Sequence, residues 1–362
     1  MNETLNHEHR ASRKRGLAAA LGAAFFFGIS APFSKLLLGS VPPLMLAGLL
    51  YLGSFAGLTA VSAVRAASGT GQSREAPVGG RDYLYLAGSI LAGGVAAPLF
   101  LLYGLTSTEA SAASLLLNIE GVLTVLLATL IFREHAGPRV WAAAAVMLAA
   151  GSILVYARAE GGGLPVNAGS LLVLASSLMW ALDNNLTREL SHRDPYVISR
   201  FKGLAAGSAN LVLAFATGSA VPPVSSVAGS LALGSLSYGA SLVLFIYALR
   251  NLGAARTSTY FGAAPFIGVA ASVALLGEAL SLRILAASAL MLAGLWLILR
   301  EYHDHEHTHA PLCHDHAHIH DEHHCHGHDG EFSEPHSHMH THDGLTHTHA
   351  HSPDLHHFHR HR

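Results

Sequence analysis

The stretch ASAASLLLNIEGVLTVLLATLIF, residues 110–132, decides the fold class of this chain. It contains a single ionisable side chain, Glu120, near its centre. A bilayer core about 30 Å thick is crossed by a helix of roughly 20 apolar residues. The stretch therefore predicts a transmembrane helix that carries a carboxyl group near the middle of the membrane.

Comparable apolar stretches continue on both sides of it through most of the 362 residues, which are 51% hydrophobic and only 12% charged. Soluble domains carry about 25% charged residues. The connecting segments are short and leave no room for a soluble catalytic domain, so we expect no enzymatic activity. The pattern predicts an all-α integral membrane protein with ten transmembrane helices, at 16–38, 44–64, 83–105, 110–132, 140–156, 168–190, 196–217, 227–249, 257–276 and 284–299.

The distribution of positive charge predicts the orientation of these helices, because Lys and Arg are retained in cytoplasmic loops. With the N-terminus inside, fourteen Lys and Arg fall in inside segments, whereas the outside ends hold only Lys35, Arg158 and Arg283. Arg200 and Lys202 are set apart because they fall within the seventh helix. We expect a multi-pass protein of the cell (inner) membrane with both termini in the cytoplasm.

The apolar body also repeats itself. At an offset of 144 residues Tyr103-Gly104-Leu105 matches Tyr247-Ala248-Leu249, and Glu134 matches Glu278. Near the start of each half, Phe27-Gly28-Ile29 faces Trp180-Ala181-Leu182. Five helices per repeat is an odd number, so the halves are expected to have opposite orientations. Inverted repeats with a site between them are typical of transporters.

These two five-helix halves, with their Phe27-Gly28 and Trp180-Ala181 starts and the paired Glu134 and Glu278, resemble the drug/metabolite transporter superfamily in its EamA branch. The resemblance implies a ten-helix alternating-access carrier that exports small molecules. One departure is that Glu120-Gly121 stands where the ninth span has Ala264-Pro265. The expected divisions are a basic cytoplasmic N-terminus (1–15), the first EamA repeat (16–157), a linker (158–167), the second EamA repeat (168–300) and a cytoplasmic tail (301–362).

Polar side chains within the predicted spans are candidates for a substrate or ion pathway, because ionisable groups near mid-bilayer cost about 2.5–3.5 kcal/mol on insertion scales. Glu120 and Asp183 are expected to face a shared cavity, where they hold a cation or exchange protons for one. The structural alternative pairs Lys202 with Asp183 or lets Lys202 reach toward the cytoplasm. Asparagines in turn commonly bond neighbouring helices. The candidates are Asn118, Glu120, Asp183, Asn184 and Lys202.

Structural roles are the better interpretation of two further pairs. Glu134 and Glu278 follow apolar spans, where a turn or helix terminus satisfies a carboxylate. Gly203 and Gly207 have the small-xxx-small spacing that lets helices approach closely.

The tail, residues 301–362, has a different composition. It holds 2 Lys and Arg against 11 Asp and Glu, and 23 of the 27 histidines, mostly alternating with other residues. Imidazole suits Zn, Cu and Ni, so we predict a segment that is disordered without metal and binds several ions loosely, less tightly as histidine protonates near pH 6. A pH-sensing or solubilising tail is the alternative. The predicted ligands are His303, His305, His307, His309, His314, His316, His318, His320, His323, His324, Cys325, His326, His328, His336, His338, His340 and His342.

Three functional hypotheses follow from these features. The first is a secondary carrier that exports a divalent transition metal in exchange for protons. The resemblance places nickel or cobalt ahead of zinc as the metal. The second is an exporter of a metabolite, amino acid or drug with a metal-responsive tail. The third is a membrane-anchored metal buffer or sensor. The sequence contains no Walker A pattern, and no resident cofactor is required. The lipid bilayer is the expected partner, and nucleic acid is not. Whether the protein forms a homodimer is left open.

Overall fold

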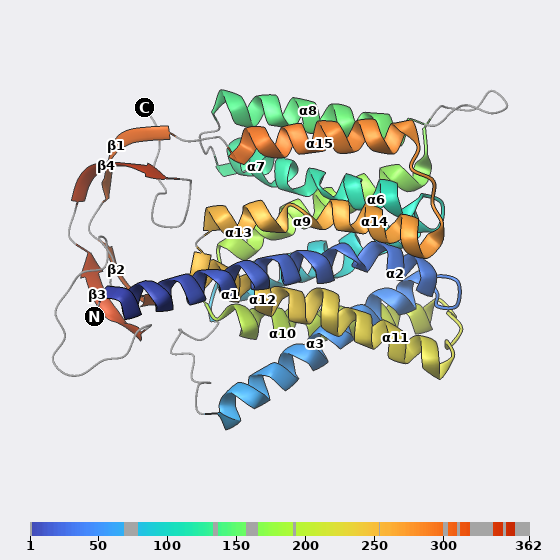
Figure 1. Ribbon diagram of the computed structural model, residues 1–362. Coiled ribbons are helices and arrows are strands. Elements are labelled where there is room, and N and C mark those ends of the chain that lie inside the picture. The colour runs from blue at the N-terminus through green and yellow to red at the C-terminus, as the bar shows by residue number, and fades with distance from the viewer. Residues whose placement is uncertain are drawn as a thin grey trace.

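The computed structural model describes residues 2–68, 79–132, 137–156, 166–190, 193–252 and 254–299, with four tail segments, 303–309, 312–318, 336–342 and 345–351. Regular structure in the described body is helical (Figure 1). The α-helices are α1 (Asn2–Gly28), α2 (Ser30–Leu37), α3 (Pro43–Ala67), α4 (Asp82–Ser89), α5 (Ala97–Leu105), α6 (Ala110–Leu117), α7 (Ile119–Phe132), α8 (Pro138–Val155), α9 (Ala168–Arg188), α10 (Pro195–Ala216), α11 (Val224–Gly234), α12 (Ser241–Leu252), α13 (Ala254–Phe261), α14 (Ala264–Leu276) and α15 (Leu282–Leu299).

Helices lie at all ten ranges that the hydropathy pattern singles out, several of them made of two or three consecutive elements. In the described part of the chain, seven are long and apolar enough to cross a membrane: 14–37, 43–67, 82–105, 110–131, 138–155, 224–249 and 257–276. Leu282–Ile298 is apolar but shorter. The helices α9 and α10 contain polar side chains such as Asp183 and Lys202, which lower their apolar character. The number of ten spans stays a prediction.

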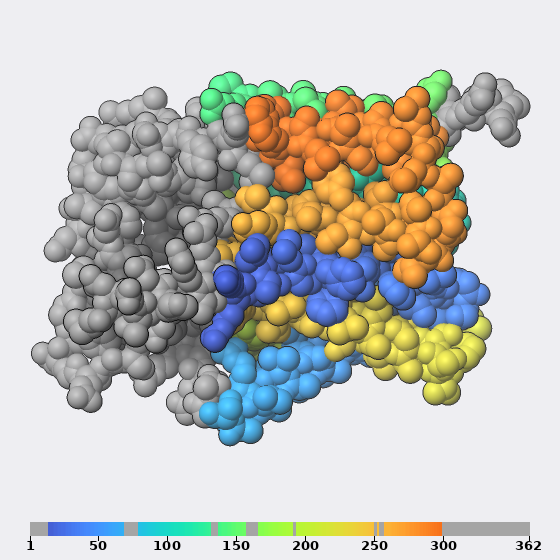
Figure 2. Space-filling model, viewed as in Figure 1, coloured from blue at the N-terminus to red at the C-terminus, as the bar shows by residue number. Residues whose placement is uncertain are grey.

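The two halves of the chain interleave. Helix α3 packs on α10, α1 on α12, α5 on α9, and α8 on α15, so each of these pairs joins one half to the other. Figure 2 shows α1 in the middle of one face, between segments of the second half on either side. Helix α1 begins and α15 ends at the same end of the bundle (Figure 1).

Irregular helix geometry recurs at equivalent places in the halves. A π-helical turn, η1 (Ile90–Ala96), lies between α4 and α5, and a second, η2 (Ser235–Ala240), between α11 and α12. The backbone N–H of Asn118 donates a hydrogen bond to the carbonyl of Leu115 where α6 gives way to α7. At the same 144-residue offset, Gly262 and Ala263 separate α13 from α14. The internal repeat is thus visible in these helix interruptions.

Glycines permit close helix approach. A Cβ on Gly53 of α3 would lie 2.2 Å from the carbonyl oxygen of Leu231, and one on Gly234 of α11 would lie 2.0 Å from that of Leu50. Helix α10 meets α3 similarly, since a Cβ on Gly207 would lie 2.9 Å from the backbone nitrogen of Leu52. The expected packing role of the Gly203 and Gly207 pair fits this contact.

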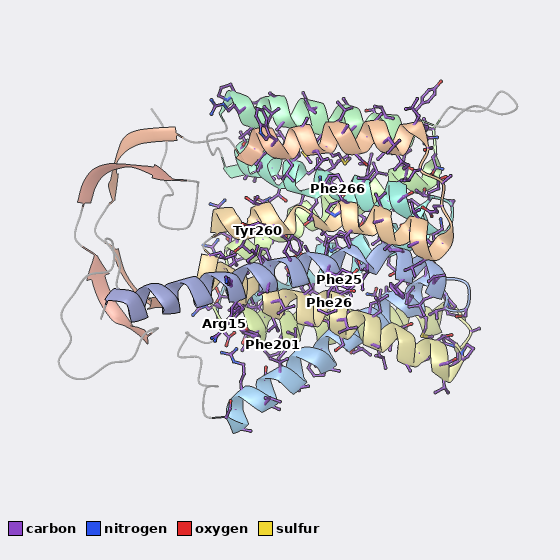
Figure 3. All side chains as sticks on the ribbon, in the orientation of Figure 1. Arg15, Phe25, Phe26, Phe201, Tyr260 and Phe266 are labelled. Atoms are coloured by element: carbon purple, nitrogen blue, oxygen red, sulfur yellow. The ribbon has the colours of Figure 1, made fainter. Side chains whose placement is uncertain are left out.

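Large apolar side chains also cover the outside of the bundle. Phe25 on α1 is 50% exposed and Phe201 on α10 is 57% exposed, and both are labelled in Figure 3. An outer surface rich in such residues matches contact with lipid rather than with water.

The described segments of the tail form four strands: β1 (His303–His309), β2 (Leu312–His318), β3 (His336–His342) and β4 (Leu345–His351). Antiparallel pairing joins β1 to β4 and β2 to β3, with His305 opposite His349 and His314 opposite His340. This differs from the disorder expected of the tail. The physical reason is that histidine at every second position has the two-residue period of a strand.

Candidate functional site

A cavity of about 390 Å³ lies where the fourth helix of each half is interrupted. It is lined by elements of both halves, which places it between the repeats. Most of its lining is apolar. The residues around it are Phe27, Gly28, Ser30, Ala31, Ser114, Leu117, Asn118, Glu120, Gly121, Asn184, Phe245, Ser258, Phe261, Gly262, Ala264, Pro265 and Leu295.

Among the described residues of this lining, Glu120 is the only acidic side chain, and it lies in the first turn of α7. Its Oε1 accepts a hydrogen bond from Nδ2 of Asn184 on α9 at 2.8 Å. The same amide nitrogen lies 3.2 Å from Oγ1 of Thr124, which donates to the backbone oxygen of Glu120 at 2.8 Å. Among the described residues, no Lys or Arg forms an ion pair with Glu120. The carboxyl group therefore faces the cavity held by neutral amide and hydroxyl groups.

Two further polar groups in the lining are buried without a partner. Nδ2 of Asn118 and Oγ of Ser114 form no hydrogen bond within the described part of the chain. Both come from the interrupted fourth helix, on either side of Leu117. Buried donors are normally satisfied, so these two are available to a bound molecule.

Asp183 and Lys202 lie outside the lining and bind one another, α9 to α10. Asp183 is 5% exposed, and its Oδ1 also accepts from Ser89 at 2.5 Å and Thr187 at 3.1 Å. A Cβ on Gly93 would fall 1.9 Å from Asp183 Oδ2, so glycine in η1 makes room for the carboxylate. The pair neutralises its own charge. Neighbouring positions on a helix point about 100° apart, which explains why Asn184 reaches the cavity and Asp183 does not.

Of the five predicted pathway residues, the structure thus brings Asn118, Glu120 and Asn184 together around one cavity. Asp183 and Lys202 pair with one another, as the structural alternative of the sequence analysis predicts. Sequence reasoning missed the aromatic side of the site: Phe27, Phe245 and Phe261 line it, with ring centroids 5.4 Å apart for Phe27 and Phe261 and 5.0 Å for Phe245 and Phe261. Phe27 belongs to the segment Phe27-Gly28-Ile29 that faces Trp180-Ala181-Leu182 in the internal repeat, which was the one available signal.

Glu278 lies beyond α14, outside the membrane-spanning segments, and closes one end of the bundle. Its carboxylate accepts hydrogen bonds from the backbone N–H groups of Ala110 at 2.7 Å and Ser111 at 2.9 Å, at the start of α6, and lies 3.5 Å from Nζ of Lys35. Partial burial raises the pKa of Glu278, but the bonds from Ser111 and Ala110 and the charge of Lys35 outweigh it and leave that pKa below its ordinary value. This confirms the structural interpretation of Glu278, whereas Glu134 lies outside the described residues.

The side chains of the predicted metal ligands in the tail lie outside the part of the chain that the structure describes. For six of these ligands the backbone lies outside it as well: His320, His323, His324, Cys325, His326 and His328. Within the part of the chain where side chains are described, no three His, Cys, Asp or Glu residues cluster as a metal site would require. Metal binding by the tail therefore stays a prediction.

A multi-pass helical protein with two repeated halves around a central cavity has the architecture of a secondary transporter. The model of the EamA-like transporter family matches residues 14–157 and again 167–300. The chain is 30% identical over 295 residues to an uncharacterized transporter of Methanothermobacter thermautotrophicus, covering 78% of this chain and 85% of that protein. It belongs to the EamA-like transporter family.

Two other similarities are less extensive. The chain is 28% identical over 190 residues to the uncharacterized inner membrane transporter YedA of Escherichia coli K12, which covers 50% of this chain and 61% of that protein. A solved structure described as "Crystal structure of protein" matches with a TM-score of 0.56 and 21% identity over 78% of this chain and 96% of that one. That match shows the fold alone.

Proposed function

We propose that this protein is a secondary-active exporter that carries a small organic molecule through the cavity between its two repeats, with ten helices crossing the membrane. The observation that carries the proposal is the cavity itself, which lies at the interruptions of both fourth helices and has a mainly apolar lining with a few polar groups. Pockets of this kind and size suit organic ligands. Interrupted helices around a central site are a recurring feature of transporters.

The unequal closure of the two ends supports alternating access. Helix α6 packs on α14, and Glu278 caps the start of α6 at that end. The repeat-equivalent helices, α7 and α13, show no packing of comparable extent within the described residues, and Asn184 on that side of the site is exposed. In Figure 1 this is the end of the bundle where α1 begins. Exchange of the two arrangements would open the cavity to the opposite side.

Protons are the counter-ion in this proposal. Glu120 is the only carboxylate that the described residues contribute to the lining, and a carboxylate can hold either a proton or a positively charged group, not both at full strength. If Glu120 binds the cargo on one side of the membrane and a proton on the other, this single residue couples export of the cargo to entry of protons.

Export of a divalent metal ion such as nickel, cobalt or zinc is the second candidate, favoured by the histidine-rich tail. The cavity supports it less well. The described residues that line it supply one carboxylate, two amides and hydroxyl groups, without histidine or cysteine, whereas transition metals prefer nitrogen and sulfur ligands. In the proposal with an organic cargo, the tail serves as a metal-responsive regulator of the carrier.

Tolerance of growing cells separates these candidates. Cells expressing the full chain, residues 1–300 alone, Glu120→Gln or the exposed-surface control Glu109→Gln would be challenged with toxic organic amines, amino acid analogues and nickel, cobalt and zinc salts. We expect tolerance to at least one organic compound from the full chain, from 1–300 and from Glu109→Gln, and loss of it with Glu120→Gln. Tolerance to metal salts alone, lost with Glu120→Gln, would overturn the proposal in favour of metal export.

A further inference from the structure

The charge of the cavity defines what it can hold. Glu120 faces it without a cationic partner among the described residues, while Asp183 is neutralised by Lys202 outside it. In a mainly apolar lining an uncompensated carboxylate favours a ligand that brings one positive charge. An anion would meet repulsion there, and a zwitterion would leave its own carboxylate beside Glu120 with no cation to meet it.

The aromatic rings add to this preference. Phe27, Phe245 and Phe261 form one cluster in the lining, drawn from α1, α12 and α13. Aromatic faces attract ammonium groups and pack against apolar bodies. They therefore suit a ligand whose positive charge is attached to an aromatic or branched aliphatic body, and they offer no ligand to a bare metal ion.

The unpartnered donors complete the description. Nδ2 of Asn118 and Oγ of Ser114 are buried without a hydrogen-bond partner in the described part of the chain. Asn118 lies two residues from Glu120, at the interruption of the fourth helix. A bound molecule that satisfies them carries a neutral acceptor, such as an amide or ester carbonyl, a few bonds from its charge.

We infer that the cavity binds a small organic monocation: an ammonium group on an aromatic or branched aliphatic body that also carries an uncharged carbonyl. This inference rests on the proposed function and names the substrate class of its site. Glu120 pairs with the ammonium, the three phenylalanines contact the body, and Asn118 with Ser114 bonds the carbonyl.

Three probes that share one phenylalanyl body test the inference: phenylalaninamide as the cation, phenylalanine of the same size as the zwitterion, and the slightly larger N-acetylphenylalaninamide as the neutral compound. Binding to the purified full chain in nanodiscs would be measured by calorimetry at pH 7.0, where more than half of the phenylalaninamide carries a protonated amino group. We expect phenylalaninamide to bind at least tenfold more tightly than phenylalanine. Glu120→Gln should remove this preference, and Glu109→Gln should keep it.

The outcomes are separable from those of the proposed function. Equal or tighter binding of phenylalanine, or binding of none of the three, would overturn the substrate class. Counterflow of labelled phenylalaninamide in proteoliposomes reports on transport separately. Cation-selective binding without counterflow would support the substrate class and overturn the proposed transport function. Counterflow of labelled phenylalanine alone would support transport and overturn the substrate class. Loss of the preference in Glu109→Gln would also count against the assigned role of Glu120.

Discussion

Asp183 and Lys202 form a partly buried ion pair between α9 and α10, with side chains 7% and 18% exposed. Removing one partner of a buried pair leaves the other charge without compensation, at a cost of about 3–5 kcal/mol. We therefore expect Asp183→Asn and Lys202→Met each to lower the thermal unfolding temperature of the purified protein. The double variant should unfold at a higher temperature than either single variant, because it leaves no isolated charge.

Thermal unfolding of all four proteins in one detergent would measure this coupling. Additive losses in the double variant would show that the two side chains contribute independently. That result would contradict an ion pair as the reason for their burial.

Glu278 gives the protein an acid-sensitive contact. Its pKa lies below the ordinary value of about 4.5, so the folded state favours the ionised form. The stabilisation is fully present above pH 4.5 and is lost as the pH falls through the lowered pKa of the folded state. Glu278→Gln should destabilise the protein by about 1–2 kcal/mol at neutral pH, since hydrogen bonds to a charged group contribute on that scale.

Melting temperatures of the original protein and of Glu278→Gln, measured between pH 3 and pH 7, would check this prediction. The difference between the two should shrink below about pH 4.5. A difference that stays constant across this range would show that the stabilising contact with Ala110 and Ser111 does not depend on the ionised form of Glu278.

Residue identity in the site was only partly predictable. Asn118, Glu120 and Asn184 could be singled out because polar side chains are rare in apolar spans. Whether Asp183 or Asn184 faces the cavity depends on helix rotation, which follows from the packing of α9 on α5 and α7 rather than from local sequence. Phe245 and Phe261 gave no signal, since aromatic residues are as common in a packed core or at a lipid surface, and Phe27 was marked only by its place in the internal repeat.

Helix α11 allows a matched test of close packing between elements. A Cβ on Gly234 would lie 2.0 Å from the backbone oxygen of Leu50, whereas one on Gly229 would meet only a methyl group of Leu37, at 3.5 Å. Gly234→Ala should force α11 away from α3 and destabilise the protein by about 1–3 kcal/mol. Gly229→Ala should be neutral or stabilise it by up to about 1 kcal/mol, because alanine favours the helix.

Unfolding temperature and the yield of monodisperse protein would report both changes. Equal stability of the two variants would mean that α11 can move without loss of contact. The close approach at Gly234 would then be unimportant for the fold.

At the scale of elements, the positions of the helices could be predicted because long apolar runs mark them. Their interruptions could not. The change from α6 to α7 occurs at the single residue Asn118, and η1 and η2 contain no proline. Such features depend on partners elsewhere: the carbonyl of Gly93 in η1 accepts hydrogen bonds from both Tyr51 and Trp180, on α3 and α9.

The whole molecule divides into an apolar body and a histidine-rich tail, and we expect the two to be separable. The full chain should bind several Ni²⁺ or Zn²⁺ ions at pH 7.5, and residues 1–300 should bind few. Binding should be largely lost at pH 5.5, because imidazole has an ordinary pKa of about 6.5 and must be neutral to bind metal. Calorimetric titration of both chains at the two pH values would measure it.

The unfolding temperature of 1–300 without metal should match that of the full chain. Equal metal binding by the two chains would remove the tail from any account of metal handling. A large loss of stability in 1–300 would instead show that the tail contributes to the fold of the body.

The two-fold division of the body could be predicted from matching residues 144 positions apart, such as Glu134 and Glu278. The interleaving of the halves could not, because contacts such as α1 with α12 join residues more than 200 positions apart. Apolar periodicity tells which segments avoid water. It does not tell which segment of the other half each one meets.

The repeat has one consequence for passage across the membrane. The two fourth helices are interrupted at equivalent points, yet only the first carries an acid there, with Ala264 at the equivalent of Glu120. A carrier with two identical half-sites could hand its cargo from one to the other. If the cargo is the organic cation proposed above, its charged end has Glu120 as its single anchor. We then expect the molecule to cross without turning end over end, with its leading and trailing ends fixed from entry to release.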